Sequence, residues 1–303
     1  MKQRISIICT IVMMVLLVVG CGPTQTGSTG ATHQVTDGTG VAVTVPSEPK
    51  RIVPIAASTE DIVLSLVDPS RVAAVGTVVN NVPEASAKVE KHVKATAESM
   101  LSVQPDLVLV PNWMSPDAIG EMRNMQIPVY VYKTPTTVEE AKAVIHEIAG
   151  LLHASDEKMI ASMDADLKTV EDIANKHSGE RPLVAFYTQF GLTGGKGSTF
   201  DDMTKYLKVY NVAAQLGLGP FDNGTREDLI KANPDIIIIP SVDYTSDGTT
   251  PATAEQLYSD PALQGVKAIA NRRVYLVDSS QVMSYSQFMT RAMVSIAQNI
   301  YSM

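Results

Sequence analysis

A stretch of fourteen residues occurs twice in this chain, at positions 98–111 and again 129 residues later at positions 227–240. Both copies begin with Glu, carry a Pro-Asp pair in the middle, and end with four aliphatic residues and a Pro. Each copy predicts a short helix, a turn and a strand, and four consecutive apolar residues are typical of a parallel strand covered on both faces. The repeat therefore predicts two α/β lobes, each with its own sheet, and a ligand cleft between them.

The first twenty residues have the character of a leader rather than of a folded element. Lys2 and Arg4 precede 15 uncharged residues at positions 5–19, a run shorter than the roughly 20 residues that a membrane-spanning helix needs. This pattern predicts a secretory signal over residues 1–20. The next residues, Val18-Val19-Gly20-Cys21, resemble a bacterial lipobox and predict lipid attachment at Cys21. The alternative is an uncleaved anchor in which Cys21 has no role.

Residues 21–36 are predicted as the lipidated cysteine and a flexible tether, because they are polar, rich in Gly and Thr, and lack an apolar period. Loss of residues 1–20 removes two positive charges and no acidic residue, which changes the formal net charge from −8 to −10. This charge argues against nucleic acid or an anionic lipid surface as a partner. Cys9 and Cys21 are the two cysteines of the chain, so no disulfide is expected after cleavage.

Strands and helices alternate in both halves of the remaining chain, which predicts an α/β fold. Residues 37–154 form the predicted N-terminal lobe, with a hairpin at 41–46, strands at 51–55, 72–75 and 129–131, the first repeat copy, and helices near 116–125 and 137–152. Residues 155–178 are polar and free of Gly and Pro, and predict one long connecting helix. Residues 179–303 form the predicted C-terminal lobe, with strands at 183–187 and 274–277, a Gly-rich loop at 191–198, the second repeat copy, and helices near 200–207, 211–216 and 286–302.

The repeat, the lipobox and the connecting helix together resemble the substrate-binding lipoproteins of ABC importers for ferric siderophores, haem and vitamin B12. The resemblance covers the chain from about residue 35, and includes Asp37-Gly38-Thr39-Gly40, Ala57-Ser58-Thr59-Glu60 and residues 194–198 and 271–275. It implies two Rossmann-like lobes joined by a single long helix, as in class III periplasmic binding proteins, with small opening motions. It also implies a monomer that carries out no covalent chemistry and has no cofactor or metal site of its own.

The resemblance gives the repeated Glu a role as well. In the family, one Glu on each lobe docks to arginines of the permease dimer, and the matching positions here are Glu98 and Glu227. Carboxylates at equivalent places on two pseudo-symmetric lobes suit a symmetric partner. Such exposed pairs contribute only about 0.2–1 kcal/mol each, so they set register and encounter rate more than affinity. The alternative is that each Glu merely favours the start of its helix.

Ligands of open α/β sheets bind outside the carboxyl ends of the strands, so the residues after each predicted strand are candidates. Trp113, the one Trp of the chain, follows the first repeat strand, at a place where the vitamin B12-binding relative also has a Trp. Aromatic and Met residues at both lips suit a large, flat, mostly apolar chelate, although core packing is the alternative for each. The predicted ligand-binding residues are Ser58, Thr59, Trp113, Tyr187, Lys196, Tyr244, Met283 and Tyr285, and Phe190 and Ser284 lie at the same strand ends.

The scarcity of arginine narrows the range of metal chelates that the cleft is expected to bind. None of the eight arginines after residue 20 clearly follows a predicted strand, whereas catecholate and citrate siderophores usually need Arg or Lys clusters. Lys196 is the one plausible cation. A corrinoid or a near-neutral hydroxamate siderophore fits better. Haem is the alternative and needs an axial ligand, for which Tyr187, Tyr244, Tyr285, Met114 and Met283 stay open.

Three other functions lack the residues they need. The run around Lys196 places Gly197 where a phosphate-binding loop needs Ser or Thr after Lys. A bare zinc or manganese site needs about three converging His and a carboxylate, and the histidines here are scattered. A surface hydrolase would need a nucleophile or metal motif, such as Gly-x-Ser-x-Gly, that the chain lacks. The family resemblance therefore remains the guide, and it implies a lipid-anchored, extracytoplasmic protein that delivers a metal chelate to an ABC permease and its ATPase.

Overall fold

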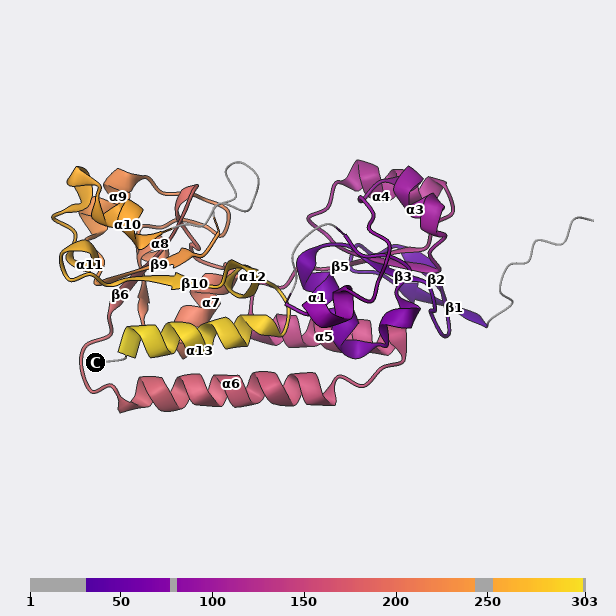
Figure 1. Cartoon of the computed structure of the whole chain (residues 1–303), viewed down its shortest axis with the longest axis horizontal. Helices are drawn as coiled ribbons and strands as arrows, with labels where there is room; N and C mark the ends of the chain where they lie inside the picture. The colour runs from indigo at the N-terminus through magenta and orange to yellow at the C-terminus, as the bar shows by residue number, and fades with distance from the viewer. Residues whose placement is uncertain (1–30, 77–80, 243–252, 302–303) are drawn as a thin grey trace, which may run out of the picture. The chain divides into compact units, whose positions relative to one another are not determined.

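The computed structural model describes residues 31–76, 81–242 and 253–301 (Figure 1), and these belong to one compact unit that begins at Ala31. The predicted signal sequence, Cys21 and Tyr244 lie outside the described residues. The two larger of three sheets stand in two lobes, each with helices around it, so the predicted α/β fold with two Rossmann-like lobes is confirmed (Figure 1).

The first lobe is built on a parallel sheet of order β3-β4-β5. Ile52 lies opposite Leu107, and Val108 opposite Val129. All three strands are buried along their whole length, as their unbroken apolar sequences require. The elements of this lobe are β1 (Thr32–Thr36), β2 (Ala42–Pro46), β3 (Ile52–Pro54), α1 (Ala57–Leu66), η1 (Pro69–Arg71), α2 (Pro83–Ser86), α3 (Ala97–Val103), β4 (Leu107–Pro111), α4 (Pro116–Asn124), β5 (Val129–Tyr132) and α5 (Val138–Leu152).

The second lobe repeats this plan and extends it. Its sheet has the order β10-β9-β6-β7, with β8 also paired to β6, and β6, β9 and β10 are parallel. Its elements are β6 (Leu183–Thr188), β7 (Gly191–Thr193), α7 (Thr199–Tyr206), β8 (Tyr210–Asn211), α8 (Val212–Gln215), α9 (Arg226–Ala232), β9 (Ile236–Pro240), α10 (Ala254–Tyr258), η2 (Pro261–Leu263), α11 (Lys267–Ala270), β10 (Val274–Val277), α12 (Ser279–Val282) and α13 (Phe288–Tyr301).

The repeated Pro-Asp pair ties each copy of the repeat to the neighbouring strand. The Asp106 carboxylate accepts hydrogen bonds from the backbone nitrogens of Lys50 and Arg51, at 2.7 and 2.9 Å, just before β3. Asp235 accepts one from the nitrogen of Leu183, at 2.9 Å, at the start of β6. The same residue thus fixes the same strand pairing in both lobes, which explains why the Asp occurs in both copies.

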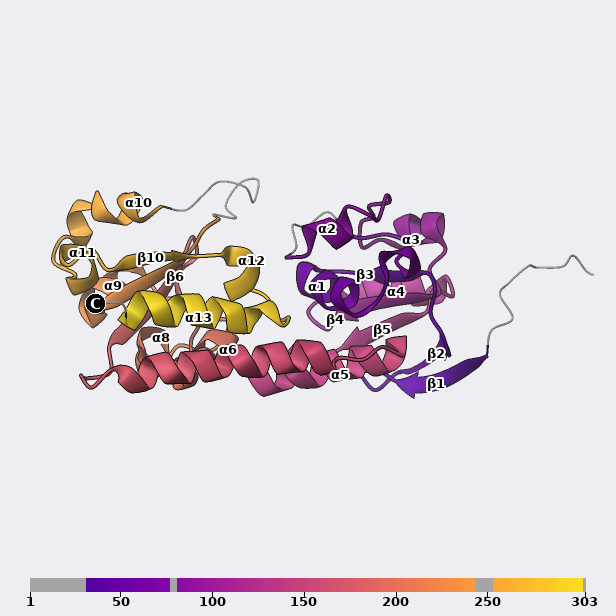
Figure 2. The same cartoon turned by 60° about the horizontal axis from the view of Figure 1, so that its bottom comes forward.

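The connecting helix α6 (Glu157–Lys176) packs on elements of both lobes. It lies alongside α13 in both views (Figures 1 and 2), where the Thr290 hydroxyl donates a hydrogen bond to Asp166 at 2.9 Å. Asp164 of the same helix pairs with Lys142 of α5 at 2.7 Å. One cluster of buried side chains also runs through both lobes. A shared core and a single helix along both lobes favour small opening motions.

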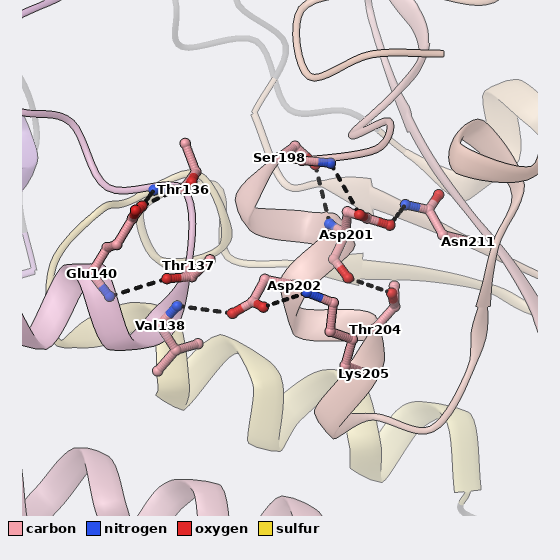
Figure 3. Close-up of polar contacts among 11 residues, drawn as sticks. Thr136, Thr137, Val138, Glu140, Ser198, Asp201, Asp202, Thr204, Lys205 and Asn211 are labelled. Carbon is pink, nitrogen blue, oxygen red and sulfur yellow. Dashed lines mark hydrogen bonds and ion pairs between the residues drawn. The ribbon is translucent and has the colours of Figure 1, made fainter. Parts of the chain in front are cut away.

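A direct hydrogen bond joins the start of α5 to α7 of the second lobe (Figure 3). The carboxylate of Asp202 accepts it from the backbone nitrogen of Val138 at 2.9 Å, and pairs with Lys205 on its own helix. Asp202 is almost fully buried, so the unpaired N–H group at the helix start gains a buried acceptor from the other lobe.

Asp202→Ala is expected to lower the free energy of unfolding by about 1–3 kcal/mol, because it leaves a buried N–H group without its acceptor. Denaturant titration of the folded protein measures this loss. Asp172→Ala is the matched control, since its ion pair with Lys168 is exposed and such changes usually stay within about 0.5 kcal/mol. Equal stability of the two variants would show that the bond from Val138 does not hold the lobes together.

The structure corrects three local predictions. Val72 and Val75 form only isolated bridges, to Ile52 and His92, instead of a strand at 72–75. Residues 191–193 of the predicted loop form β7, which pairs antiparallel with β6. The predicted tether ends before Thr32, because residues 32–36 form β1 and pair antiparallel with β2.

Candidate functional site

A cavity of about 410 Å³ lies where the carboxyl ends of strands from both lobes meet. The first lobe contributes the residues after β3 and Trp113 after β4, and the second lobe contributes the residues after β6 and β10. Trp113, Phe190 and Met283 are 59, 64 and 41% exposed, so the cavity opens to solvent at an apolar rim. Its lining residues are Ala56, Ala57, Ser58, Trp113, Gln189, Phe190, Ser279, Ser280, Met283, Ser284 and Tyr285.

The wall from the first lobe is the start of helix α1. This helix begins without a side-chain cap, and its first two residues, Ala57 and Ser58, line the cavity. Ala56, just before them, has a φ of +88°, which a residue with a side chain rarely adopts. The amino end of a helix favours electronegative ligand groups, so this wall suits a ligand with oxygen acceptors.

The wall from the second lobe is a run of serines with one partly buried aromatic residue, Tyr285. Ser280 donates a hydrogen bond to the side-chain oxygen of Asn81 at 2.8 Å, and Ser284 lies 2.7 Å from Ser286. Tyr285 lines the cavity, and partial burial raises the pKa of its phenol, so it contributes a neutral hydroxyl group. The described part of the cavity lining contains no charged side chain.

Directly behind this wall, a buried carboxylate joins the lobes. Asp61 of α1 is 0% exposed. It accepts hydrogen bonds from the backbone and side-chain nitrogens of Asn81, at 2.6 and 2.8 Å, and from Ser286 at 3.2 Å. These partners are neutral, and burial raises the pKa of Asp61 to about 6. Because Asn81 also bonds Ser280, the cluster connects α1 to the cavity wall of the second lobe.

Four of the predicted ligand-binding residues line this cavity, namely Ser58, Trp113, Met283 and Tyr285. Tyr187 lines a smaller cavity of about 130 Å³ inside the second lobe. The structure does not bring Thr59 to either cavity, because its buried hydroxyl bonds the Ile55 carbonyl oxygen and the Tyr132 hydroxyl, at 2.7 and 2.8 Å. Tyr244 lies outside the described residues.

Lys196 also lies away from the described lining of the two cavities. The packing of the neighbouring glycines determines its position. Its backbone nitrogen bonds the carbonyl oxygen of Leu218 at 2.7 Å. A Cβ atom on Gly195 would approach that oxygen to 2.3 Å. Only glycine allows this close packing, so the Gly-rich run holds two loops together and leaves the Lys196 side chain exposed.

Sequence reasoning missed Gln189, Ser279 and Ser280. All three come within three residues of a strand end, so the rule that found Trp113 applies to them too. They were missed because small polar side chains carry no signature of a particular chemistry. Among the described residues, no group of three or more His, Cys, Asp or Glu side chains is placed to hold a metal ion.

The repeated Glu residues form a second candidate surface. Glu98 and Glu227 each stand in the first turn of α3 and α9, which are capped by Thr96 and Thr225. Both side chains are exposed, and neither makes a hydrogen bond or ion pair with the part of the chain that the structure describes. The caps and the Pro-Asp pairs have structural roles in the repeat, whereas the two Glu side chains make no hydrogen bond or ion pair within the described part of the chain.

Comparisons with known proteins agree with this geometry. A sequence model of the periplasmic binding protein family matches residues 52–281. The uncharacterized ABC transporter substrate-binding lipoprotein YvrC of Bacillus subtilis is 26% identical, over 99% of this chain and 98% of that protein. A cobalamin-binding protein of Halobacterium salinarum is 23% identical, over 67% of this chain and 57% of that protein. The solved periplasmic heme-binding protein RhuT from Roseiflexus sp. RS-1 shares the fold, with a TM-score of 0.70 and 20% identity over 84% of this chain and 98% of that one.

Proposed function

Because this chain belongs to the periplasmic binding protein family, we propose that it captures a corrinoid in the cavity between its lobes and passes it to an ABC permease. Members of the family are substrate-binding components of transporters and not enzymes. A ferric hydroxamate siderophore is also nearly neutral and is the ligand that resembles a corrinoid most in its charge. The absence of charged side chains from the described lining of the cavity is the observation that carries the proposal.

An uncharged lining selects among metal chelates by their charge. Catecholate and citrate siderophores carry several negative charges, and burying these without Arg or Lys partners is costly. A corrinoid presents a broad apolar face edged with neutral amides. Trp113 and Met283 suit the face, and Ser58 and Ser280 suit the edge. A corrinoid is larger than the cavity, so we expect it to enter by one edge and to lie against the open aromatic rim. Similarity to the Halobacterium salinarum protein supports the same ligand class.

Haem is the second candidate, and Tyr285 and Met283 favour it because both line the cavity and both are possible iron ligands. Two observations favour the corrinoid over haem. Burial raises the pKa of Tyr285, which disfavours the phenolate that would bind ferric iron. The described lining also offers no cation to the two carboxylates of haem.

Glu98 and Glu227 are the proposed contacts to the permease. They occupy equivalent places on the two lobes, are exposed, and make no hydrogen bond or ion pair with the residues that the structure describes. A permease built as a symmetric dimer presents the same basic group twice, so one Glu on each lobe fixes the orientation in which the ligand is delivered.

Lipid attachment at Cys21 after removal of residues 1–20 is the proposed membrane anchor. The lipobox-like sequence and the lipoprotein name of the Bacillus subtilis relative support it. Among the described residues, no helix combines the length and the apolar character needed to cross a membrane. On the strength of the lipobox-like sequence and the name of that relative, we propose that the protein stands on the extracytoplasmic face of the cell membrane.

Calorimetric titration of residues 22–303 tests the ligand. Cyanocobalamin, haemin and a ferric hydroxamate siderophore are added separately under the same conditions. We expect one-to-one binding of cyanocobalamin with a dissociation constant in the micromolar range or below. Tighter binding of haemin than of cyanocobalamin would contradict the proposal and favour the second candidate.

A further inference from the structure

The side chain of Gln189 is unusual among the polar groups of the cavity. Gln189 follows β6 and borders two cavities, the one between the lobes and the smaller one lined by Tyr187, Ile239 and Leu257. Both its amide nitrogen and its amide oxygen are buried, and neither has a hydrogen-bond partner in the chain as described. The neighbouring serines differ in this respect, since Ser280 and Ser284 bond Asn81 and Ser286.

A buried amide without partners destabilises the protein that contains it, because water has been removed and nothing replaces it. Such a group is expected where a ligand supplies the missing bonds. Gln189 lines the cavity, and rotation about the terminal torsions of its side chain would turn the amide toward a bound ligand. The amide carries donor and acceptor on adjacent atoms. A carboxylate would pair only with its nitrogen, and an ammonium group only with its oxygen.

We infer that Gln189 forms a paired hydrogen bond with a carboxamide of the ligand and so selects amide-bearing chelates over carboxylate-bearing ones. This inference rests on the proposed corrinoid function. The peripheral side chains of a corrinoid end in primary amides, whereas the side chains at the edge of haem end in carboxylates. Gln189 therefore acts as a residue that determines specificity at a site whose other described lining residues are apolar side chains, serines and the Tyr285 phenol.

Gln189→Met tests this, because Met has nearly the same length and lacks the amide. We expect the variant to have a higher thermal midpoint than the wild type in the absence of ligand, since a buried unpaired group is removed. We also expect about tenfold weaker binding of cyanocobalamin, since two hydrogen bonds are lost. Gln215→Met, at an exposed site at the end of α8, is the matched control and should change neither quantity.

A ligand-side change shows whether the amide itself is recognised. Mild hydrolysis of cyanocobalamin gives monocarboxylic acids in which one amide is replaced. One of these acids should bind the wild type more weakly than cyanocobalamin does. The same acid and cyanocobalamin should bind Gln189→Met with equal affinity. Unchanged affinity of Gln189→Met for cyanocobalamin would overturn the inference about Gln189 alone. Failure of the wild type to bind cyanocobalamin at all would overturn the proposed function and the inference together.

Discussion

Reversing both repeated carboxylates, as Glu98→Arg with Glu227→Arg, is expected to reduce ligand uptake by cells at least tenfold and to leave ligand affinity unchanged. Both residues lie in the first turns of α3 and α9, away from the described cavity lining. Loss of one exposed ion pair contributes only about 0.2–1 kcal/mol. Reversal does more, because it places like charges opposite each other at both contacts.

The measurement is uptake of the labelled ligand by cells that express each variant, together with calorimetric affinity of the purified protein. Glu121→Arg with Glu180→Arg is the matched control, since it changes the net charge equally at two exposed sites outside the repeat. Each single reversal should give an intermediate rate. A double variant that transports normally, or that loses ligand affinity, would refute docking through these residues.

The pH dependence of stability should reveal the buried carboxylate of Asp61. Its pKa is about 6 in the folded protein, against an ordinary value of 3.8, because burial disfavours the charged form. Between these values the folded chain holds a proton that the unfolded chain releases. The proton therefore stabilises the fold fully below pH 3.8, and this contribution is lost as the pH rises through 6. The difference corresponds to about 3 kcal/mol.

Asp61→Asn removes the titration while keeping the shape of the side chain. The free energy of unfolding is measured by denaturant titration at intervals between pH 4 and pH 7.5. The wild type should lose about 2.5 kcal/mol more than the variant across this range, whatever the absolute stability of Asp61→Asn. Asp68→Asn serves as a control, because Asp68 also accepts a bond from a serine, Ser70, but is exposed. Parallel pH profiles for wild type and Asp61→Asn would contradict a raised pKa at this site.

The sequence was sufficient to predict elements whose apolar pattern is long or unbroken. The strands β4 and β9 and the helices α5 and α13 fall within about two residues of their predicted positions, because burial on one or both faces dictates their composition. Short elements were not predicted correctly. Val72 and Val75 have strand-forming side chains but only single bridges. β7 begins at Gly191, where a Cβ atom would lie 2.3 Å from the Gly224 carbonyl oxygen. The glycine is therefore required by a loop that is distant in the sequence, and not by a local turn.

The site was predictable where topology decides it. The strand-end rule placed Ser58, Trp113, Met283 and Tyr285 at one cavity. The rule could not show which of two neighbouring helix residues lines the cavity. Successive residues of α1 differ by about 100° around the axis, so Ser58 lines the cavity while Thr59 faces Tyr132 in the core. Nor could it show that Gln189 lacks internal partners, because hydrogen bonding depends on three-dimensional contacts.

Quenching of Trp113 fluorescence by cyanocobalamin tests ligand and location together. Trp113 is the one Trp of the chain, and it stands at the rim of the cavity. A corrinoid bound there should quench its emission to a plateau at one equivalent, with the same dissociation constant that calorimetry gives. Calorimetric binding without quenching would place the ligand elsewhere, and no saturable response in either measurement would refute a corrinoid-binding function.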